Sequence, residues 1–183
     1  TRNRGTVGGS IVHGDPSAEI PLAALALEAT IVLRSISGET NIPLDGFFEA
    51  AMVTKIEPDQ ILTEIRVPVW RGGAIGTGFH ETASRQCDYA IVAAAAQVEL
   101  AGDGTIIKAA VSAGGVSPSP LKLRGVEAAL VGKTPADIEA VCGTLENEID
   151  PDTDVHATAD YRARVAAKLV TRAVRDAVAE ARK

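Results

Sequence analysis

The sequence predicts an α+β fold. Three observations lead to it: β-branched segments flank a turn within residues 29–44, two long apolar segments flank an Asp-Gly turn within residues 88–116, and helical patterns dominate the rest of the C-terminal part. We therefore expect a small antiparallel sheet packed on a helical bundle in the second part of the chain.

The chain has 183 residues, enough for one domain or two small ones. Hydrophobic residues make up 46% of it but aromatic residues only 3%, so the core must be packed from Ala, Val, Ile and Leu. The formal net charge is -6, whereas binding to phosphate backbones requires clustered Lys and Arg. Nucleic acid is therefore not an expected partner.

The two cysteines, Cys87 and Cys142, lie far apart and have no His or Cys at ligand spacing, so no metal site is expected. This usage fits a reducing, cytoplasmic setting. The sequence shows neither a charged-then-apolar leader nor a long apolar run, so neither secretion nor a membrane span is predicted. The chain opens on Thr1 rather than Met, which indicates that the natural N-terminus lies outside this sequence.

The first part of the chain is expected to hold a short helix and a hairpin. Asp15 and Pro16 are typical of a helix start, because Asp can accept from free amides and Pro fits the first helical position. We expect a helix over residues 17–27. Residues 29–36 are rich in β-branched side chains, and after a Ser-Gly-Glu turn residues 40–44 can return as a second strand.

A third strand is predicted at residues 60–68. Apolar Ile61, Ile65 and Val67 alternate there with polar residues, which is typical of a half-buried strand. Pro68 ends it, because proline has no amide to donate to a neighbouring strand.

A glycine-rich stretch at residues 71–78 follows, with four glycines in eight positions. Glycine loses more backbone entropy than other residues when it is fixed in a regular element, so we expect this stretch to break regular structure. The boundary between two domains is placed here, with residues 1–70 in the first and residues 75–183 in the second.

Two long antiparallel strands are expected at residues 88–100 and 105–116, joined by the Asp-Gly turn at 101–104. The remainder is expected to be helical. One helix has Pro135 just inside its start and runs to about Asn147.

A last helix is predicted from Asp160. Tyr161, Val165 and Leu169 recur every four residues and form an apolar stripe. Basic residues flank this stripe: Arg162, Arg164, Lys168 and Arg172. We interpret them as a solvated face and assign them no binding role.

The segment from Gly5 to Asp15 carries the clearest chemical signal. Its four glycines let the backbone approach a ligand closely while amides and hydroxyls point at it, which suits a pyrophosphate. It is not a Gly-x-Gly-x-x-Gly motif after a strand, and it lacks the Lys of a P-loop. From these residues alone, a phosphate-binding loop and an ordinary glycine-rich turn both remain open.

The order of the later segments resembles one protein family. TVGGSIVHGDPSAEIP is followed by the hairpin, by EPDQILTEIRVP and by GFHETASRQCDYAIVAAAA. This order is similar to that of the FAD-binding medium subunit of molybdenum hydroxylases, the xanthine dehydrogenase and carbon monoxide dehydrogenase family, without its N-terminal part. The resemblance covers essentially the whole chain. It implies the C-terminal part of a PCMH-type FAD-binding domain, followed by a domain like the C-terminal domain of the CO dehydrogenase flavoprotein.

The resemblance also implies which residues contact FAD. Thr6, Gly8, Gly9 and Ser10 would do so through backbone amides and hydroxyls, near the pyrophosphate and the flavin. Leu62 occupies the position that packs near the isoalloxazine ring in relatives, and an ordinary core role is compatible with that position.

Two acidic residues, Asp15 and Glu19, lie where the family places a carboxylate against the cofactor, and Glu19 is the closer positional match. A carboxylate can accept hydrogen bonds from a ribitol or ribose hydroxyl. An acid in the first turn of a helix is also favoured by the helix dipole, so both interpretations stay open.

Two histidines are candidate cofactor contacts. His80 falls where xanthine-oxidising relatives carry a lysine near the flavin ring, and a neutral imidazole could donate one hydrogen bond there without the permanent charge. His13 stands within the glycine-rich segment. A structural or exposed role is the alternative for both, and His156 is expected to be solvated. No catalytic residue is expected from this chain.

The resemblance implies an oxidoreductase subunit with partners. In relatives a large subunit with a molybdopterin cofactor hydroxylates the substrate, a small subunit carries [2Fe–2S] clusters, and FAD passes electrons to an external acceptor. A dimer of such heterotrimers is expected. A second glycine-rich FAD motif of the family does not occur here, so the chain alone is expected to bind FAD weakly. A non-redox nucleotide-binding module and a structural docking module remain as other hypotheses.

Overall fold

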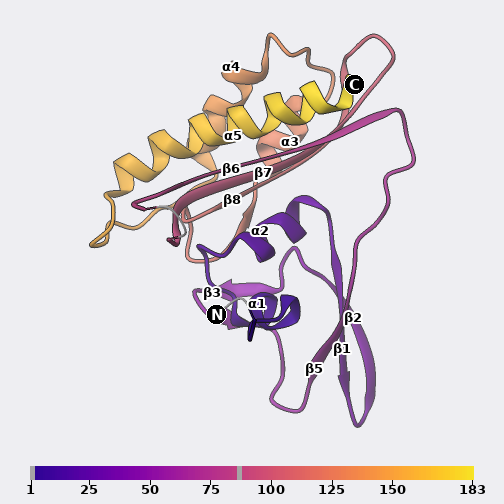
Figure 1. The fold of residues 1–183 in the computed structure, drawn as a ribbon, viewed down its shortest axis with the longest axis vertical. Helices are drawn as coiled ribbons and strands as arrows, with labels where there is room; N and C mark the ends of the chain where they lie inside the picture. The colour runs from indigo at the N-terminus through magenta and orange to yellow at the C-terminus, as the bar shows by residue number, and fades with distance from the viewer. Residues whose placement is uncertain (1–2, 86–87) are drawn as a thin grey trace.

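The computed structural model describes residues 3–85 and 88–183. An N-terminal half with short strands lies below a C-terminal half that is built on a four-stranded sheet (Figure 1). This mixture of helices and antiparallel sheets is the α+β fold expected from the sequence. Of the two cysteines, Cys87 lies outside the described residues and Cys142 is a buried free thiol.

The N-terminal half contains two helices and two small sheets. Its elements are α1 Val7–His13, α2 Glu19–Ala26, β1 Thr30–Ser35, β2 Gly38–Pro43, β3 Phe48–Ala50, β4 Val53–Thr54 and β5 Ile61–Arg66. β1 pairs antiparallel with both β2 and β5, and β3 pairs with β4. The hairpin and the third strand predicted from the sequence are confirmed.

The start of α2 differs from the prediction. The helix begins at Glu19, and Asp15 accepts a hydrogen bond from the Ser17 amide (2.8 Å) in the turn before it. Asp15 therefore stabilises the connection between α1 and α2 instead of capping α2. Short polar side chains form such local turns as readily as they cap helices.

The pattern predicted for the third strand is wrong on one face, because the pairing of β1 with β5 contains a bulge. Val32 lies opposite Glu64 but Leu33 lies opposite Leu62, so Thr63 is an extra residue on β5. One inserted residue changes the face to which the rest of the strand points. Leu62 consequently packs on the core of this half, while Ile61 is 69% exposed.

The C-terminal half contains the long sheet and most of the helices. Its elements are β6 Ala74–Ala83, β7 Ala90–Leu100, β8 Ile106–Gly114, β9 Leu121–Lys122, α3 Arg124–Leu130, α4 Ile138–Cys142, a 3-10 helix Gly143–Asn147 and α5 Ala159–Ala181. The strand order is β6-β7-β8-β9, all antiparallel. The two long strands expected around the Asp-Gly turn are confirmed.

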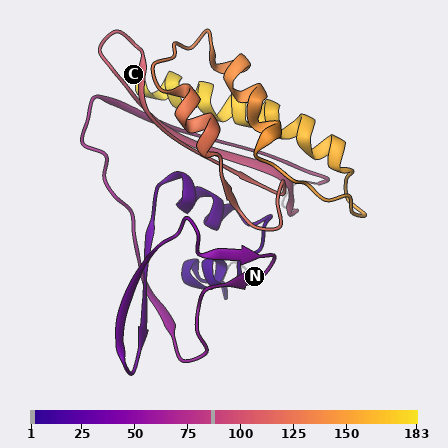
Figure 2. The same ribbon diagram turned by 180° about the vertical axis from the view of Figure 1, so that it is seen from behind.

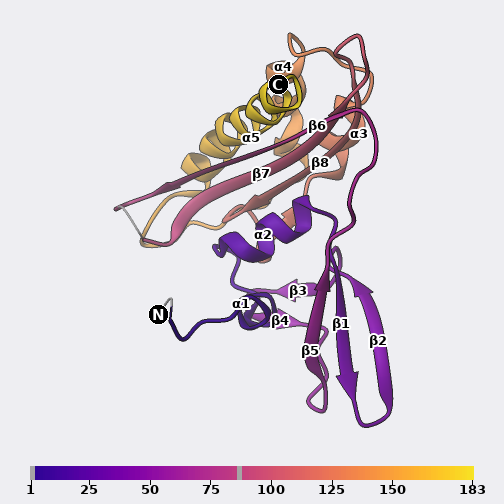
Figure 3. The same ribbon diagram turned by 45° about the vertical axis from the view of Figure 1, so that its right-hand side comes forward.

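The sheet is covered on both faces. Figure 2 shows the orange and yellow helices α3, α4 and α5 together on one side and the indigo α2 on the other, and Figure 3 shows the same three layers edge-on. Alternate residues of β7 serve the two faces: Ala94 and Ala96 join the α5 side, whereas Ala93 and Ala95 meet Leu22 of α2. Burial on both faces explains why β7 is apolar at nearly every position.

The glycine-rich stretch does not break regular structure over its whole length, because β6 runs through it from Ala74. A Cβ atom at Gly76 would lie 2.0 Å from the Ala177 carbonyl oxygen, and one at Gly78 would lie 2.0 Å from that of Ala173. These glycines let α5 lie directly on β6. Close packing, rather than chain flexibility, is their role here.

The helices of the C-terminal half begin at other residues than expected. Pro135 lies in a turn in which Asp137 accepts from the Thr134 amide (3.0 Å), and α4 starts only at Ile138. α3 falls within the stretch that we expected to be helical, although no bounds were predicted for it. It begins at Arg124, where the Glu148 carboxylate accepts from the Gly125 amide (2.7 Å).

The last helix, α5, is confirmed, but its buried stripe is not the predicted one. Thr158 caps it by accepting from the Tyr161 amide (3.2 Å). Tyr161 is 38% exposed, while Arg162, which we assigned to the solvated face, is 7% exposed. Arg162 lies one turn before Ala166 and two turns before Leu169, so it falls on the stripe that the sheet covers.

Candidate cofactor site

The glycine-rich segment forms a helix, not the loop expected from the sequence. Thr6 has an extended backbone and its hydroxyl accepts from the Gly9 amide (2.9 Å), so it is the N-cap of α1. Gly14, at φ 66°, ends the helix in the left-handed conformation that glycine adopts without strain. The N-cap Thr6 and the C-terminal Gly14 stabilise the helix enough to outweigh Gly8 and Gly9, which are weak helix formers.

The start of α1 offers backbone donors on an open surface. The amides of Val7 and Gly8 precede the first possible partners within the helix and therefore have no intrahelical acceptor. Thr6 and Gly9 are exposed, and Gly8 and Ser10 are partly so. Two free amides beside a hydroxyl are a donor set that suits phosphate oxygens.

Leu62 forms the wall beside this helix start. A Cβ atom on Gly8 would lie 3.3 Å from its Cδ2 atom, which is tighter than ordinary packing. A Cβ atom on Gly9 would lie 2.8 Å from the Thr6 hydroxyl oxygen. The structure thus brings together Thr6, Gly8, Gly9 and Leu62, all of them predicted from the sequence, and a side chain at either glycine would require Leu62 or Thr6 to shift.

A cleft of about 390 Å³ opens at the other end of α1. Four parts of the chain meet there: the turn after α1, the turn between β3 and β4, the described residues on either side of residues 86–87, and the loop that leads into α5. Residues that line it include His13, Asp15, Met52, Tyr89, His156 and Arg162. The first two were predicted as cofactor contacts, and His13 is exposed as expected of an accessible group. Tyr89, which is 75% exposed, was not singled out by the sequence.

Arg162 fixes the deep wall of this cleft. Its guanidinium donates to the carbonyl oxygens of Ile91 and Gly115 and pairs with Asp154 (2.7 Å). The Gly115 amide in turn donates to the carbonyl oxygen of Pro16 (3.0 Å). One side chain of α5 is therefore linked through β7 and β8 to the turn that carries Asp15. The signal for it was present in the sequence, because an arginine stood on the apolar stripe of a helix.

Asp154 is held ionised by its neighbours. Backbone amides of Ala157 and His156 and the Arg162 guanidinium donate to its carboxylate, and together they lower the pKa of Asp154 to about 2. His156, the histidine expected to be solvated, is exposed next to it. The side of the cleft near α5 therefore carries the ion pair of Asp154 and Arg162 at neutral pH.

Glu19 is the first residue of α2, and its charge acts on Glu81 of β6. Burial raises the pKa of Glu81, and the negative charge of Glu19 raises it further, so the two carboxylates are neighbours. Glu19 is exposed. Its position at the helix start matches the interpretation as a first-turn acid, and its exposure is compatible with a ligand contact.

His80 is separated from the other predicted residues. Its Nε2 atom lies 2.7 Å from a carboxylate oxygen of Asp176 on α5. Gly78, two residues earlier on β6, also faces α5, and residues two apart on a strand share a face. His80 therefore points to the helical side of the sheet, whereas α1 and α2 lie on the opposite side (Figure 3).

Two negative findings bear on the kind of site. Within residues 3–85 and 88–183, no three His, Cys, Asp or Glu side chains gather closely enough to hold a metal ion. None of the helices in the described part of the chain combines the length and apolar character needed to cross a membrane.

The fold and this site define an α+β protein with a glycine-rich helix, whose first turn has free backbone amides and whose other end borders a cleft. Residues 1–70 match the family model for the FAD binding domain in molybdopterin dehydrogenase, and residues 77–177 match that for the CO dehydrogenase flavoprotein C-terminal domain. The chain belongs to this family of flavoprotein subunits of molybdenum hydroxylases. The family and fold class expected from the sequence are confirmed.

Individual relatives agree with the family models. The chain is 36% identical, over 99% of its length, to the alpha subunit of the 6-hydroxypseudooxynicotine dehydrogenase complex of Paenarthrobacter nicotinovorans. It is 32% identical, over 94% of its length, to the carbon monoxide dehydrogenase medium chain of Hydrogenophaga pseudoflava. It spans 62% of the first of these proteins and 60% of the second.

Solved structures show the same arrangement. A chain of carbon monoxide dehydrogenase from Hydrogenophaga pseudoflava superimposes with a TM-score of 0.92 at 33% identity, covering 98% of this chain and 62% of that one. A chain of quinoline 2-oxidoreductase from Pseudomonas putida 86 gives 0.89 at 29% identity, covering 100% and 63%. The relationship therefore extends over both halves of the chain.

Proposed function

We propose that this chain is part of a subunit that binds FAD and passes electrons from [2Fe–2S] clusters of a partner subunit to an external acceptor. The observation that carries the proposal is the order of the two family matches, FAD-binding first and flavoprotein C-terminal second, over residues 1–70 and 77–177. We propose residues 1–70 and 75–183, which contain these two matches, as its domains.

The start of α1 is the proposed pyrophosphate contact. The amides of Val7 and Gly8 are free to donate, and the Thr6 hydroxyl, which accepts from Gly9, still has its own proton to give to a phosphate oxygen. The Ser10 hydroxyl, on the next turn, is a further donor. The missing side chains at Gly8 and Gly9 keep this surface open to the cofactor.

Leu62, His13 and the two acids would complete the cofactor contacts. Leu62 supplies an apolar wall for the flavin side. Asp15 uses one carboxylate oxygen on Ser17 and has a second one available for a sugar hydroxyl, and Glu19 is an exposed alternative to it. A cofactor contact by His80 stays a prediction. Its pairing with Asp176 on α5 gives this contact less support than the positions of the other residues give theirs.

Bound FAD supplies the redox chemistry, and the residues of this chain hold and orient it. We propose a large molybdenum-binding subunit and a small iron–sulfur subunit as partners, in a dimer of heterotrimers located in the cytoplasm. The names of the relatives, a medium chain and a subunit of a complex, support the presence of partner subunits. Substrate oxidation is assigned to the molybdenum partner, because no catalytic group is needed in this chain.

The sharpest test of the site compares two substitutions of Thr6 in the full-length protein. Thr6→Val keeps the shape but removes both the cap and the donor, so we expect FAD per protein molecule to fall at least several-fold. Thr6→Ser keeps the hydroxyl and should retain the flavin. The FAD released on denaturation measures the occupancy.

Thr158→Val is the matched control, because Thr158 caps α5 in the same way, away from the α1 helix start. It should leave the FAD content unchanged. Equal flavin in Thr6→Val and wild type would refute the proposed pyrophosphate contact. A native complex that copurifies with its partners but releases no flavin would instead favour the structural docking hypothesis.

A further inference from the structure

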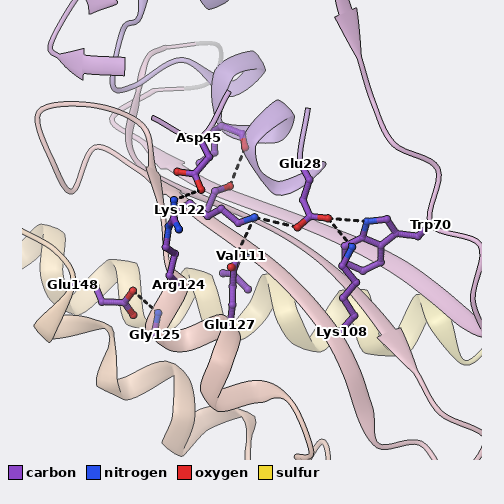
Figure 4. A network of polar contacts seen from close by, with 12 residues as sticks. Glu28, Asp45, Trp70, Lys108, Val111, Lys122, Arg124, Gly125, Glu127 and Glu148 are labelled. Atoms are coloured by element: carbon purple, nitrogen blue, oxygen red, sulfur yellow. Dashed lines mark hydrogen bonds and ion pairs between the residues drawn. The ribbon is translucent and has the colours of Figure 1, made fainter. Parts of the chain in front are cut away.

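The end of α2 is tied to the C-terminal half by a single carboxylate. Glu28 follows α2 with a positive φ of 54°, and Figure 4 shows its side chain between Trp70, Lys108 and Lys122. It accepts from the Trp70 indole (3.1 Å) and from the ammonium groups of Lys108 (2.6 Å) and Lys122 (3.2 Å). The Lys108 nitrogen also lies 3.8 Å from the centre of the Trp70 ring.

A second carboxylate, that of Glu127 in the C-terminal half, also lies close to Lys122. A Glu127 oxygen on α3 lies 3.7 Å from the Lys122 nitrogen and accepts from the Val111 amide (2.7 Å). The Lys122 and Glu127 side chains are only 12% and 13% exposed. Lys122 therefore stands between a carboxylate of the N-terminal half and one of the C-terminal half.

The charges around Glu127 come from several elements. Lys122 on β9 attracts its negative charge, whereas Glu28 after α2 and Asp45 after β2 repel it. Arg124, on the same helix, is paired with Asp45 (2.6 Å), and Lys108 on β8 is paired with Glu28. Glu148, which accepts from amides at the start of α3, is the remaining acid close by.

This setting favours the neutral acid. Burial, with the negative charges of Glu28 and Asp45, raises the pKa of Glu127 to about 7, although the Val111 amide and Lys122 act in the opposite direction. For Glu28 burial also favours the neutral form, but the two lysines outweigh it and lower its pKa. The two carboxylates that share Lys122 thus change charge in different pH ranges.

We propose that this junction is a proton-dependent latch between the two halves of the chain. When Glu127 is neutral, Lys122 pairs with Glu28 alone, and this ion pair holds the end of α2 against the sheet. With Glu127 ionised, Lys122 is shared between the two carboxylates and the hold on Glu28 weakens.

The opposite end of α2 is fixed by contacts that do not titrate. The Ser112 hydroxyl donates to the Leu22 carbonyl (2.9 Å), and the Gly115 amide donates to that of Pro16 (3.0 Å). Release at Glu28 therefore lets α2 pivot about its first turns. β1 starts at Thr30, two residues after Glu28, so the β2-β1-β5 sheet moves with the freed end.

Hydrogen exchange and Trp70 fluorescence in the full-length protein test the latch between pH 6 and pH 8. After correction for the intrinsic exchange rate, protection of the amides in residues 27–33 should fall several-fold as the pH rises, with a midpoint near the pKa of Glu127. The Trp70 emission, isolated by subtracting a Trp70→Phe variant, should change with the same midpoint.

Three variants separate the latch from general effects of pH. Glu127→Gln stays neutral and should keep the protected state at pH 8. Glu28→Gln removes the shared carboxylate and should show the weakly protected state at both pH values. Glu139→Gln, on the exposed side of α4, should behave as wild type.

The proposal is overturned if the wild-type signals do not change between pH 6 and pH 8. It is equally overturned if Glu127→Gln shows the wild-type midpoint, because the titrating group would then lie elsewhere. Either result leaves the FAD proposal untouched, since flavin content is measured separately.

Discussion

Arg162 shows how much one buried charge can organise. Within residues 3–85 and 88–183 it is the only charged residue whose side chain is buried. A buried guanidinium is tolerated only where its donors are satisfied. Its partners are two backbone carbonyls and Asp154. They belong to β7, to the end of β8 and to the loop before α5, so the cleft next to α1 depends on this side chain for its shape.

Replacing Arg162 by Met is expected to cost about 3 kcal/mol of unfolding free energy, because it leaves two carbonyls without their donor and Asp154 without its ion-pair partner. Urea denaturation of the chain measures the loss. Arg164→Met is the control, because Arg164 is exposed on the same helix and its loss should cost less than about 0.5 kcal/mol. Equal effects of the two variants would show that the buried contacts contribute no stability.

Glu127 gives the stability a pH dependence of known sign. Its pKa is raised in the folded chain to about 7 from the ordinary value of 4.5, so the folded state binds more protons between these values. Its contribution is fully present below pH 4.5 and is lost as the pH rises through 7.

From pH 6 to pH 8 the wild type should therefore lose about 1 kcal/mol relative to Glu127→Gln. The measurement is the difference between the two unfolding free energies at each pH, which cancels the titration of the histidines. A constant difference across this range would contradict the assignment.

At the scale of elements, the contact between α5 and β6 depends on two glycines. Gly78→Ala would place a methyl group 2.0 Å from the Ala173 carbonyl oxygen. Since backbone cannot move aside as a flexible side chain can, we expect a loss of about 3 kcal/mol. Thermal or urea unfolding measures it.

Gly102→Ala is the matched control, because a Cβ atom there would meet nothing within 4 Å. It should change the stability by less than about 0.5 kcal/mol. If Gly78→Ala were equally harmless, α5 could shift away from β6, and the close approach would not be a requirement of the fold.

Local patterns predicted the elements well where one physical signal dominated. The β1–β2 hairpin could be predicted from β-branched residues around a Gly-containing turn. The helix α5 could be predicted from apolar residues that recur about every four positions. The bulge at Thr63 and the path of β6 through the glycines could not be predicted, because each depends on a neighbour distant in sequence. A bulge is a property of two strands, and Gly78 is explained only by Ala173.

The same limit applies to the candidate site. Its contiguous part, Thr6 to Ser10, was recognisable in the sequence, although its helical conformation was not. The cleft lined by Tyr89 and Arg162 is assembled by the packing of β7 and α5 on the first turn of the chain, so no local pattern contains it. His80 was selected by position along the sequence, and the alternation of β6 turns it toward α5.

At the scale of the whole molecule, the two halves meet through α2. This helix belongs to the N-terminal half in sequence but covers Ala90, Ala93 and Ala95 of the sheet through Leu22 and Ala26. Polar contacts surround that apolar centre, with Glu28 at one end of the helix and Pro16 near the other.

If the chain is divided into residues 1–70 and 75–183, we therefore expect that the two fragments do not fold independently. Residues 75–183 alone would expose the alanine face of β7 to water, and we expect them to aggregate or to lose the cooperative transition of the intact chain. Coexpression with residues 1–70 should restore a soluble complex, which gel filtration detects. A monomeric, cooperatively folding fragment would contradict this.

The shared helix also bears on how such a protein can diversify. A surface that two modules must both fit changes only when substitutions on each side compensate, so the small alanines of β7 and the residues of α2 that rest on them are constrained as a pair. The tip of the β1–β2 hairpin, at residues 36–38, is exposed and takes no part in this contact, so it carries no such constraint. New specificity toward partners would therefore arise at the hairpin and at the rim of the cleft, while the orientation of one module on the other is inherited unchanged.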